Sequence, residues 1–235
     1  LLSLVMLIAA FSVHAQQLDR EATLDGRPNL NGVWKAINTA HWNLEAHSAE
    51  GLDRRFWQMG AIAAIPAGKS VLKGGGEIPY LPEALKQRND NRAAWPQEDP
   101  EAKCYMLGIP RATYHDIPFQ IFQGAMDDDL LMVYPFAASQ RVIHMNETNG
   151  LPLDAWMGKS NGRWEGDTLV VTTLNQNGMT WLDRAGNHAS YNLVVTERFT
   201  LIGSNHIWYE ATLDDPQTYS ESWSIEMPLY RLVED

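Results

Sequence analysis

One segment of the sequence combines three side chains that can transfer or hold protons. Asp183, Arg184 and His188 lie within six positions of one another, in the segment 174–192. A carboxylate can act as a base, a guanidinium can hold an oxyanion or a carboxylate, and an imidazole exchanges protons near neutral pH. Long loops on a rigid β scaffold often carry binding residues. We therefore expect Asp183, Arg184 and His188 to be catalytic, with Trp181 beside them in the substrate-binding site.

The same segment also has a structural interpretation. Asp183 and Arg184 could bind the backbone of their own loop and hold the turn at Gly186-Asn187. Short polar side chains commonly organise loops in this way. The sequence leaves both interpretations open.

Strand periodicity indicates a second group of candidate residues. Glu197 and Glu221 are each in phase with the apolar residues of their predicted strands, so both carboxylates are expected to point into the protein. An ionised carboxylate in an apolar interior must be paired, protonated or placed in a polar cavity. Arg141 and Arg163 are the candidate partners, and the alternative is a bulge that turns either strand's charged face outward. The predicted substrate-binding side chains are Trp181, Glu197, Glu221, Trp223, Arg141 and Tyr219.

Histidines could in principle hold a metal ion. His115, His144 and His188 could combine with a carboxylate to bind zinc or copper, but none of them stands in an H-x-x-x-H or H-x-H spacing. We therefore predict neither a metal site nor a cofactor. Cys104 is the only cysteine, so the chain forms no internal disulfide.

Short β-like runs recur from residue 118 onward, and the turns between several of them are too short for a parallel crossover. Such turns stand at 166–167, 203–205 and 214–216. We predict a mainly β fold, an antiparallel barrel or a strongly curved meander sheet, because closure removes exposed strand edges. The expected strands cover residues 30–37, 119–123, 130–135, 141–145, 162–165, 168–173, 193–202, 207–213 and 219–227.

The region 38–101 differs from the rest of the chain and predicts an insertion of helices and loops that lies over the barrel. Pro82 suits the first turn of a helix that continues to Ala94. The expected organisation is therefore a lead-in at 16–29 and a single barrel-like domain at 30–235 that contains the insertion.

The first 15 residues have the form of a secretory signal peptide. Leu1–Val13 is an uncharged apolar run, and Val13-His14-Ala15 is a small-x-small cleavage site. A membrane-spanning helix needs about 20 residues, so we expect cleavage and no stable membrane anchor afterwards. The positively charged start of such a peptide is missing, which suggests that the chain begins inside its reading frame. The expected location is the periplasm or the cell exterior.

Composition narrows the class of partner. Lys and Arg total 18 against 29 Asp and Glu, and the net charge of −11 disfavours nucleic acid and anionic membranes as partners. Nine Trp, eight Tyr and six Phe suit a β-rich core or a pocket that stacks flat ligands. The expected partner is therefore a small molecule.

Several sequence blocks resemble an uncharacterised family of exported bacterial proteins. The blocks are GGEIPY at 75–80, KCY and GIPRATY within 103–114, PFQI at 118–121, GRWEGDTLVV at 162–171 and WLDRAG at 181–186. The likeness runs from about Leu30 to the end of the chain and implies export but no activity. Members of the family continue past 228–231 into one more strand, so we expect the chain to be clipped at its C-terminus. Gly32-Val33-Trp34 is similar to the first-strand signature of lipocalins, which favours a barrel over a sandwich.

These observations leave three functions open, of which the first two are the main ones. The first is a cofactor-independent acid–base enzyme, of the isomerase, lyase or hydratase type, that acts on a flat or cyclic organic substrate. The second is a periplasmic carrier that holds an apolar or glycosidic ligand in the same aromatic cavity without a reaction. An envelope scaffold is the third.

Overall fold

The computed structural model describes residues 26–52, 54, 58, 64–125 and 128–233. The predicted signal peptide at 1–15 and most of the predicted lead-in at 16–29 lie outside these residues. No helix in these ranges has the length and apolar character that a membrane-spanning helix needs.

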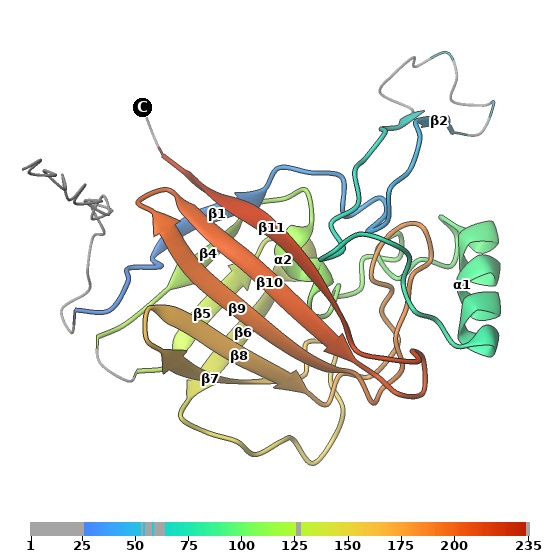
Figure 1. Cartoon of the computed structure of the whole chain (residues 1–235). Coiled ribbons are helices and arrows are strands. Elements are labelled where there is room, and N and C mark those ends of the chain that lie inside the picture. Colours follow the sequence, from blue (N-terminus) through green and yellow to red (C-terminus); the bar gives the residue numbers. More distant parts are fainter. Residues whose placement is uncertain (1–25, 53, 55–57, 59–63, 126–127, 234–235) are drawn as a thin grey trace, which may run out of the picture.

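Nine strands close into a barrel, which confirms the predicted mainly β fold (Figure 1). Their order around the barrel is β1-β11-β10-β9-β8-β7-β6-β5-β4, so both edges of every strand are paired. The strands are β1 (Gly32–Ala36), β4 (Phe119–Phe122), β5 (Leu130–Tyr134), β6 (Ser139–Met145), β7 (Lys159–Glu165), β8 (Thr168–Leu174), β9 (Val194–Gly203), β10 (His206–Asp214) and β11 (Trp223–Leu232).

Side-chain alternation sets which face of each strand turns inward. Along β9, Val195, Glu197, Phe199 and Leu201 are buried while the residues between them are half-buried. The short turns act as predicted, because β7 pairs with β8, and β9 with β10, in antiparallel hairpins. The inward position predicted for Glu197 is therefore confirmed.

One strand pair departs from the predicted antiparallel pattern. β6 and β7 are parallel, with Ile143 opposite Ser160 and Met145 opposite Gly162. The connection 146–158 is long enough to carry the chain back to the starting end of the barrel. A Cβ at Gly162 would lie 2.5 Å from Ile143 Cγ2, so this close pairing requires glycine.

The last strand begins later than predicted, and this moves Glu221 out of the barrel. The carbonyl oxygen of Asp215 holds a turn by accepting hydrogen bonds from the backbone N–H groups of Thr218 and Tyr219, and β11 starts only at Trp223. Tyr219 instead forms an isolated bridge with Tyr80. Glu221 is exposed in the connection, so its predicted inward orientation is wrong.

Large side chains fill the inside of the barrel. Trp34, Phe119, Phe199 and Tyr209 are fully buried there, joined by Tyr114 from the short helix α2 (Arg111–Tyr114). A 3-10 turn, η2 (Phe136–Ala138), connects β5 to β6. The aromatic composition left open a β-rich core or a pocket that stacks flat ligands. Inside the barrel these side chains form a core, and the pocket described below lies at the barrel end.

The insertion covers one end of the barrel (Figure 1). It contains the predicted helix, α1 (Pro82–Ala94), and a two-stranded sheet of β2 (Glu50–Gly51) and β3 (Ala64–Ile65). The long loop between β8 and β9 runs beside α1, and Asn91 Nδ2 donates to Gly186 O at 3.1 Å. A Cβ at Gly186, whose φ is +86°, would lie 2.6 Å from Arg92 N. Helix and loop are therefore packed backbone to backbone.

Candidate active site and binding pocket

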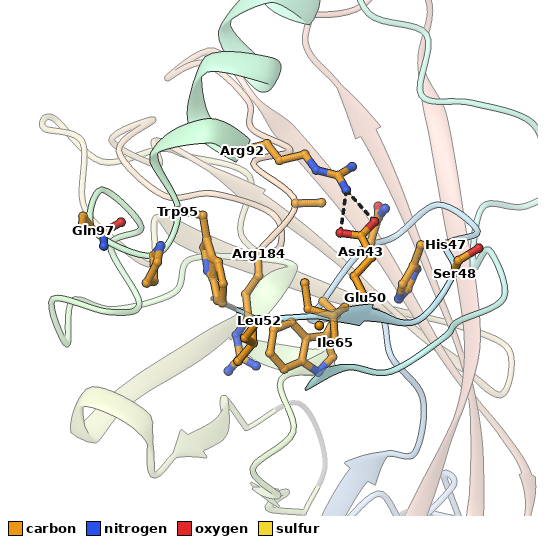
Figure 2. Close-up of a pocket in the computed structure, with 14 residues that line it drawn as sticks. Asn43, His47, Ser48, Glu50, Leu52, Ile65, Arg92, Trp95, Gln97 and Arg184 are labelled. Carbon is orange, nitrogen blue, oxygen red and sulfur yellow. Dashed lines mark hydrogen bonds and ion pairs between the residues drawn. The ribbon is translucent and has the colours of Figure 1, made fainter. Parts of the chain in front are cut away.

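A pocket of about 800 Å³ opens between the insertion and the long loop. Its walls come from residues 42–52 and Ile65 of the insertion, from Arg92 near the end of α1 and residues 95–97 after it, and from Arg184 and Ala185 of the loop. In Figure 2, Trp95 and Arg184 lie on one side of this pocket, and His47 and Ser48 on the other. The walls therefore belong to connections, and the barrel only supports them.

Two indole rings give the pocket its aromatic surface. Trp42 and Trp95 lie edge to face, with ring centroids 5.9 Å apart and an interplanar angle of 64°. The guanidinium of Arg184 lies 4.3 Å from the centroid of the Trp42 ring, a cation–π contact. The site thus combines rings that can stack on a flat molecule with a fixed positive charge.

Ion pairs hold both arginines of the pocket. Arg92 Nη2 lies 3.1 Å from Glu50 Oε1, as the dashed lines in Figure 2 show. Arg184 Nε donates to both carboxylate oxygens of Glu101, at 3.2 and 3.0 Å, and its Nη2 donates to the same carboxylate. Each guanidinium is therefore anchored on one edge.

Behind Arg184 lies a buried ionic cluster. Arg111 is 1 % exposed and donates to both oxygens of Asp99, at 2.8 and 2.9 Å, and also to Glu101. His115 Nε2 lies 3.2 Å from Glu101 Oε1. Burial would raise the pKa of Glu101, but hydrogen bonds from His115 and Arg184 and the charge of Arg111 hold that pKa well below its usual value. Glu101 therefore stays ionised.

Asp183 lies in the loop but organises backbone. Its side chain is fully buried and accepts hydrogen bonds from the N–H groups of Leu44, Ala185 and Asn187, at 2.9, 2.9 and 3.1 Å. The Asn187 side-chain amide donates to it as well, at 2.6 Å. Burial raises the pKa of Asp183 although these hydrogen bonds oppose the rise. This geometry is that of the structural interpretation, in which Asp183 holds the loop.

His188 links the loop to α1. Its Nε2 lies 3.0 Å from Ala84 O, and its ring stacks on Tyr80 with centroids 5.7 Å apart. Burial lowers the pKa of His188. Trp181 forms a bridge with His188, and its carbonyl oxygen accepts a hydrogen bond from Arg111. Of the three predicted catalytic residues, only Arg184 lines the pocket.

The predicted substrate-binding residues do not meet at one place. Inside the barrel, Arg141 donates to Glu197, and Tyr209 Oη donates to the other oxygen of Glu197 at 2.9 Å. Tyr219 packs against Tyr80 and Trp223 at another position, with centroid distances of 5.3 and 5.4 Å. The interior carboxylate is thus paired with Arg141, one of its two predicted partners, and belongs to the core.

Ser160 stands in a Gly158-Lys159-Ser160-Asn161-Gly162 sequence, which has the G-x-S-x-G form of a hydrolase nucleophile. That motif works on a sharp turn from strand to helix. Here Ser160 lies within β7, is buried, and accepts a hydrogen bond from Arg141 Nε at 2.7 Å. It is a core residue of the barrel.

The histidines of the conceivable metal site have separate partners. His115 contacts Glu101, His144 Nδ1 lies 2.9 Å from Asp129 Oδ2, and His188 contacts Ala84 O. Within the described ranges, no group of three or more His, Cys, Asp and Glu side chains is placed to hold a metal ion.

The lowered pKa of His41, which is next to Trp42, predicts that the stability of the protein depends on pH. Burial and the charge of Arg184 lower the pKa of His41 from 6.5 to about 4. The unfolded chain therefore binds a proton more readily, so stability is complete above pH 6.5 and is lost as the pH falls towards 4. We expect His41 to reduce the free energy of unfolding by about 2 kcal/mol between pH 7 and pH 4.5.

Denaturant unfolding of the wild type and of His41→Gln at both pH values measures this effect. The variant should lose less stability than the wild type over the same interval, because all other titrating groups are shared. Equal losses in the two proteins would assign the pH dependence to other groups.

Sequence reasoning missed most of the pocket. Trp42, Glu50, Arg92 and Trp95 all belong to the insertion, which was expected only to cover the barrel. The two tryptophans were a usable signal, because Trp42 and Trp95 stand in segments without strand or helix periodicity and therefore have no sheet or helix core to fill. Comparison with protein-family models, with curated proteins and with solved structures finds no match to this chain.

Proposed function

We propose that this protein is a ligand-binding barrel that holds a flat or cyclic organic molecule in the pocket between the insertion and the long loop. The observation that carries the proposal is the edge-to-face pair of Trp42 and Trp95 in a pocket of about 800 Å³. Pockets for small organic ligands have volumes of roughly 300–1,000 Å³ and are rich in aromatic side chains.

Binding is favoured over acid–base catalysis by the positions of the candidate groups. Asp183 is fully buried with its hydrogen bonds made inside the loop, and His188 contacts the backbone of α1. A general acid or base must come within hydrogen-bonding distance of its substrate. Arg184, which lines the pocket, would then act by holding the ligand.

Export is the second part of the proposal. It is supported by the apolar run Leu1–Val13 and the cleavage site that ends at Ala15. The natural full-length protein should appear in the periplasmic or extracellular fraction with an N-terminus at Gln16, which fractionation and N-terminal sequencing would determine. Recovery of the uncleaved chain from the cytoplasm would refute this part without affecting the binding proposal.

Trp95→Ala tests the pocket. The indole of Trp95 is half-buried at the pocket wall, and loss of a tryptophan that packs on a ligand typically costs about 2 kcal/mol or more. We expect affinity for the neutral probe 2-naphthamide to fall roughly 30-fold in calorimetric titrations.

Trp156→Ala is the matched control for this experiment. Trp156 is also half-buried and stacks on another ring, Tyr105, at a centroid distance of 5.1 Å, but it does not line the pocket. Its replacement should leave the affinity unchanged. If 2-naphthamide and other flat probes fail to bind the wild type, the proposed function is wrong.

A further inference from the structure

We propose that the pocket selects flat organic anions, carboxylates in particular, and that Arg184 and Arg92 recognise the negative group. This inference rests on the proposed function and specifies the class of ligand. Among the described residues that line the pocket, the charged side chains are Arg92, Arg184 and Glu50, so positive charge exceeds negative charge on this described surface.

Both guanidinium groups keep hydrogen-bond donors that no protein group uses within the described part of the chain. Arg184 engages Glu101 through Nε and Nη2, and no hydrogen bond to a described residue involves its Nη1. Arg92 engages Glu50 through Nη2 alone, and no hydrogen bond to a described residue involves its Nε or Nη1. Charge-assisted hydrogen bonds from arginine to carboxylate are among the stronger polar contacts in proteins.

Arg184 is fixed before any ligand arrives. One face of its guanidinium lies on Trp42, and Glu101 holds one edge. Glu101 in turn contacts Arg111 and His115, and these contacts fix the position of the carboxylate that holds Arg184. A preorganised side chain loses little conformational entropy on binding, which leaves more of the contact energy for affinity.

A cationic ligand fits the site less well than an anionic one. Two tryptophans and Glu50 could in another arrangement form a cage for an organic cation. Here Arg184 already covers Trp42, and Arg92 already pairs with Glu50, so a cation would meet two positive neighbours. The C-terminal end of α1 adds a partial negative charge of only about half a unit. The net charge of −11 on the whole protein repels an anion, but salt screens this repulsion beyond roughly 10 Å.

Three probes with the same ring system separate charge from shape. They are 2-naphthoate, 2-naphthamide and the 2-naphthyltrimethylammonium ion, each titrated calorimetrically into the full-length protein at pH 7. We expect 2-naphthoate to bind about tenfold more tightly than 2-naphthamide, and the cation to bind most weakly.

Two variants test whether the arginines carry the preference. Arg184→Met and Arg92→Gln should each lower the affinity for 2-naphthoate several-fold and leave that for 2-naphthamide almost unchanged. Arg92 is 46 % exposed, so its variant is expected to fold even if Arg184→Met does not. Arg163→Gln is the control, because Arg163 is a similarly exposed arginine paired with Glu165 on β7 and does not line the pocket.

The outcomes distinguish this inference from the proposal on which it rests. Equal affinities for all three probes, or tightest binding of the cation, would overturn the anion preference and leave the binding function standing. An unchanged preference in both arginine variants would also overturn it, because other groups would then recognise the charge. Absence of binding by all three probes would refute the proposed function itself.

Discussion

Arg141→Met is expected to destabilise the protein by about 3–5 kcal/mol, because it leaves the Glu197 carboxylate charged and unpaired inside the barrel. Glu197 is 0 % exposed and accepts hydrogen bonds from Arg141 and Tyr209. Arg141 also donates to Ser160 and Thr173, so its loss removes one hydrogen bond from each of these buried hydroxyl groups as well. Equilibrium unfolding in guanidinium chloride measures the effect.

The double variant Arg141→Met/Glu197→Gln should recover a large part of that loss. It removes both charges, and the amide of the new side chain can still accept a hydrogen bond from Tyr209. A double variant no more stable than Arg141→Met would show that packing around Arg141, and not the isolated charge, determines the cost.

The next residue along β9 provides a matched control. Arg198 lies on the outer face and pairs with Glu165 at 2.9 Å, where both side chains are 40 % exposed. Water already solvates these groups, so Arg198→Met should change the unfolding midpoint within the error of the measurement. Equal effects of the two arginine substitutions would contradict the inward orientation of Arg141.

Asp183→Asn should destabilise the protein by about 3 kcal/mol, the second large effect. The carboxylate accepts four hydrogen bonds, whereas an amide at the same place presents an NH₂ group to some of those donors. Buried donors without an acceptor are costly. Urea unfolding and amide hydrogen exchange at Leu44, Ala185 and Asn187 measure the change.

Asp154→Asn is the control for this substitution, because Asp154 is an exposed aspartate on another loop. It should have little effect on stability. A catalytic role for Asp183 gives a different result: Asp183→Asn would then fold with normal stability and lose only turnover. Normal stability together with unaltered amide exchange would contradict the structural role.

The fold was largely accessible from the sequence because strand and helix periods are local signals. The alternation around Glu197 fixed its inward direction, and Pro82 marked the start of α1 correctly. The parallel pairing of β6 with β7 was not accessible, because the connection 146–158 carries no helix that would signal a crossover. The start of β11 was misplaced because the turn at Asp215 depends on hydrogen bonds to its carbonyl and carboxylate oxygens, which periodicity does not reveal.

The site was much less accessible, since it depends on contacts between distant segments. Arg184 was recognised as a candidate from its neighbours in sequence, but Trp42 and Glu101 reach it only through the fold. Asp183 has the same local sequence whether it transfers protons or holds backbone. The two roles are distinguished only by the burial of its carboxylate and by the hydrogen bond that it accepts from the N–H of Leu44, which comes from a remote part of the chain.

Because the pocket walls belong to connections, ligand preference can change without any change in a strand. Ser48, Trp95 and Gln97 line the pocket outside the barrel and carry none of the hydrogen bonds by which Asp183 holds the loop. Directed evolution confined to these three positions would retarget recognition while the barrel keeps its register. Nature has the same freedom, so proteins with this barrel can diverge in specificity faster than in architecture.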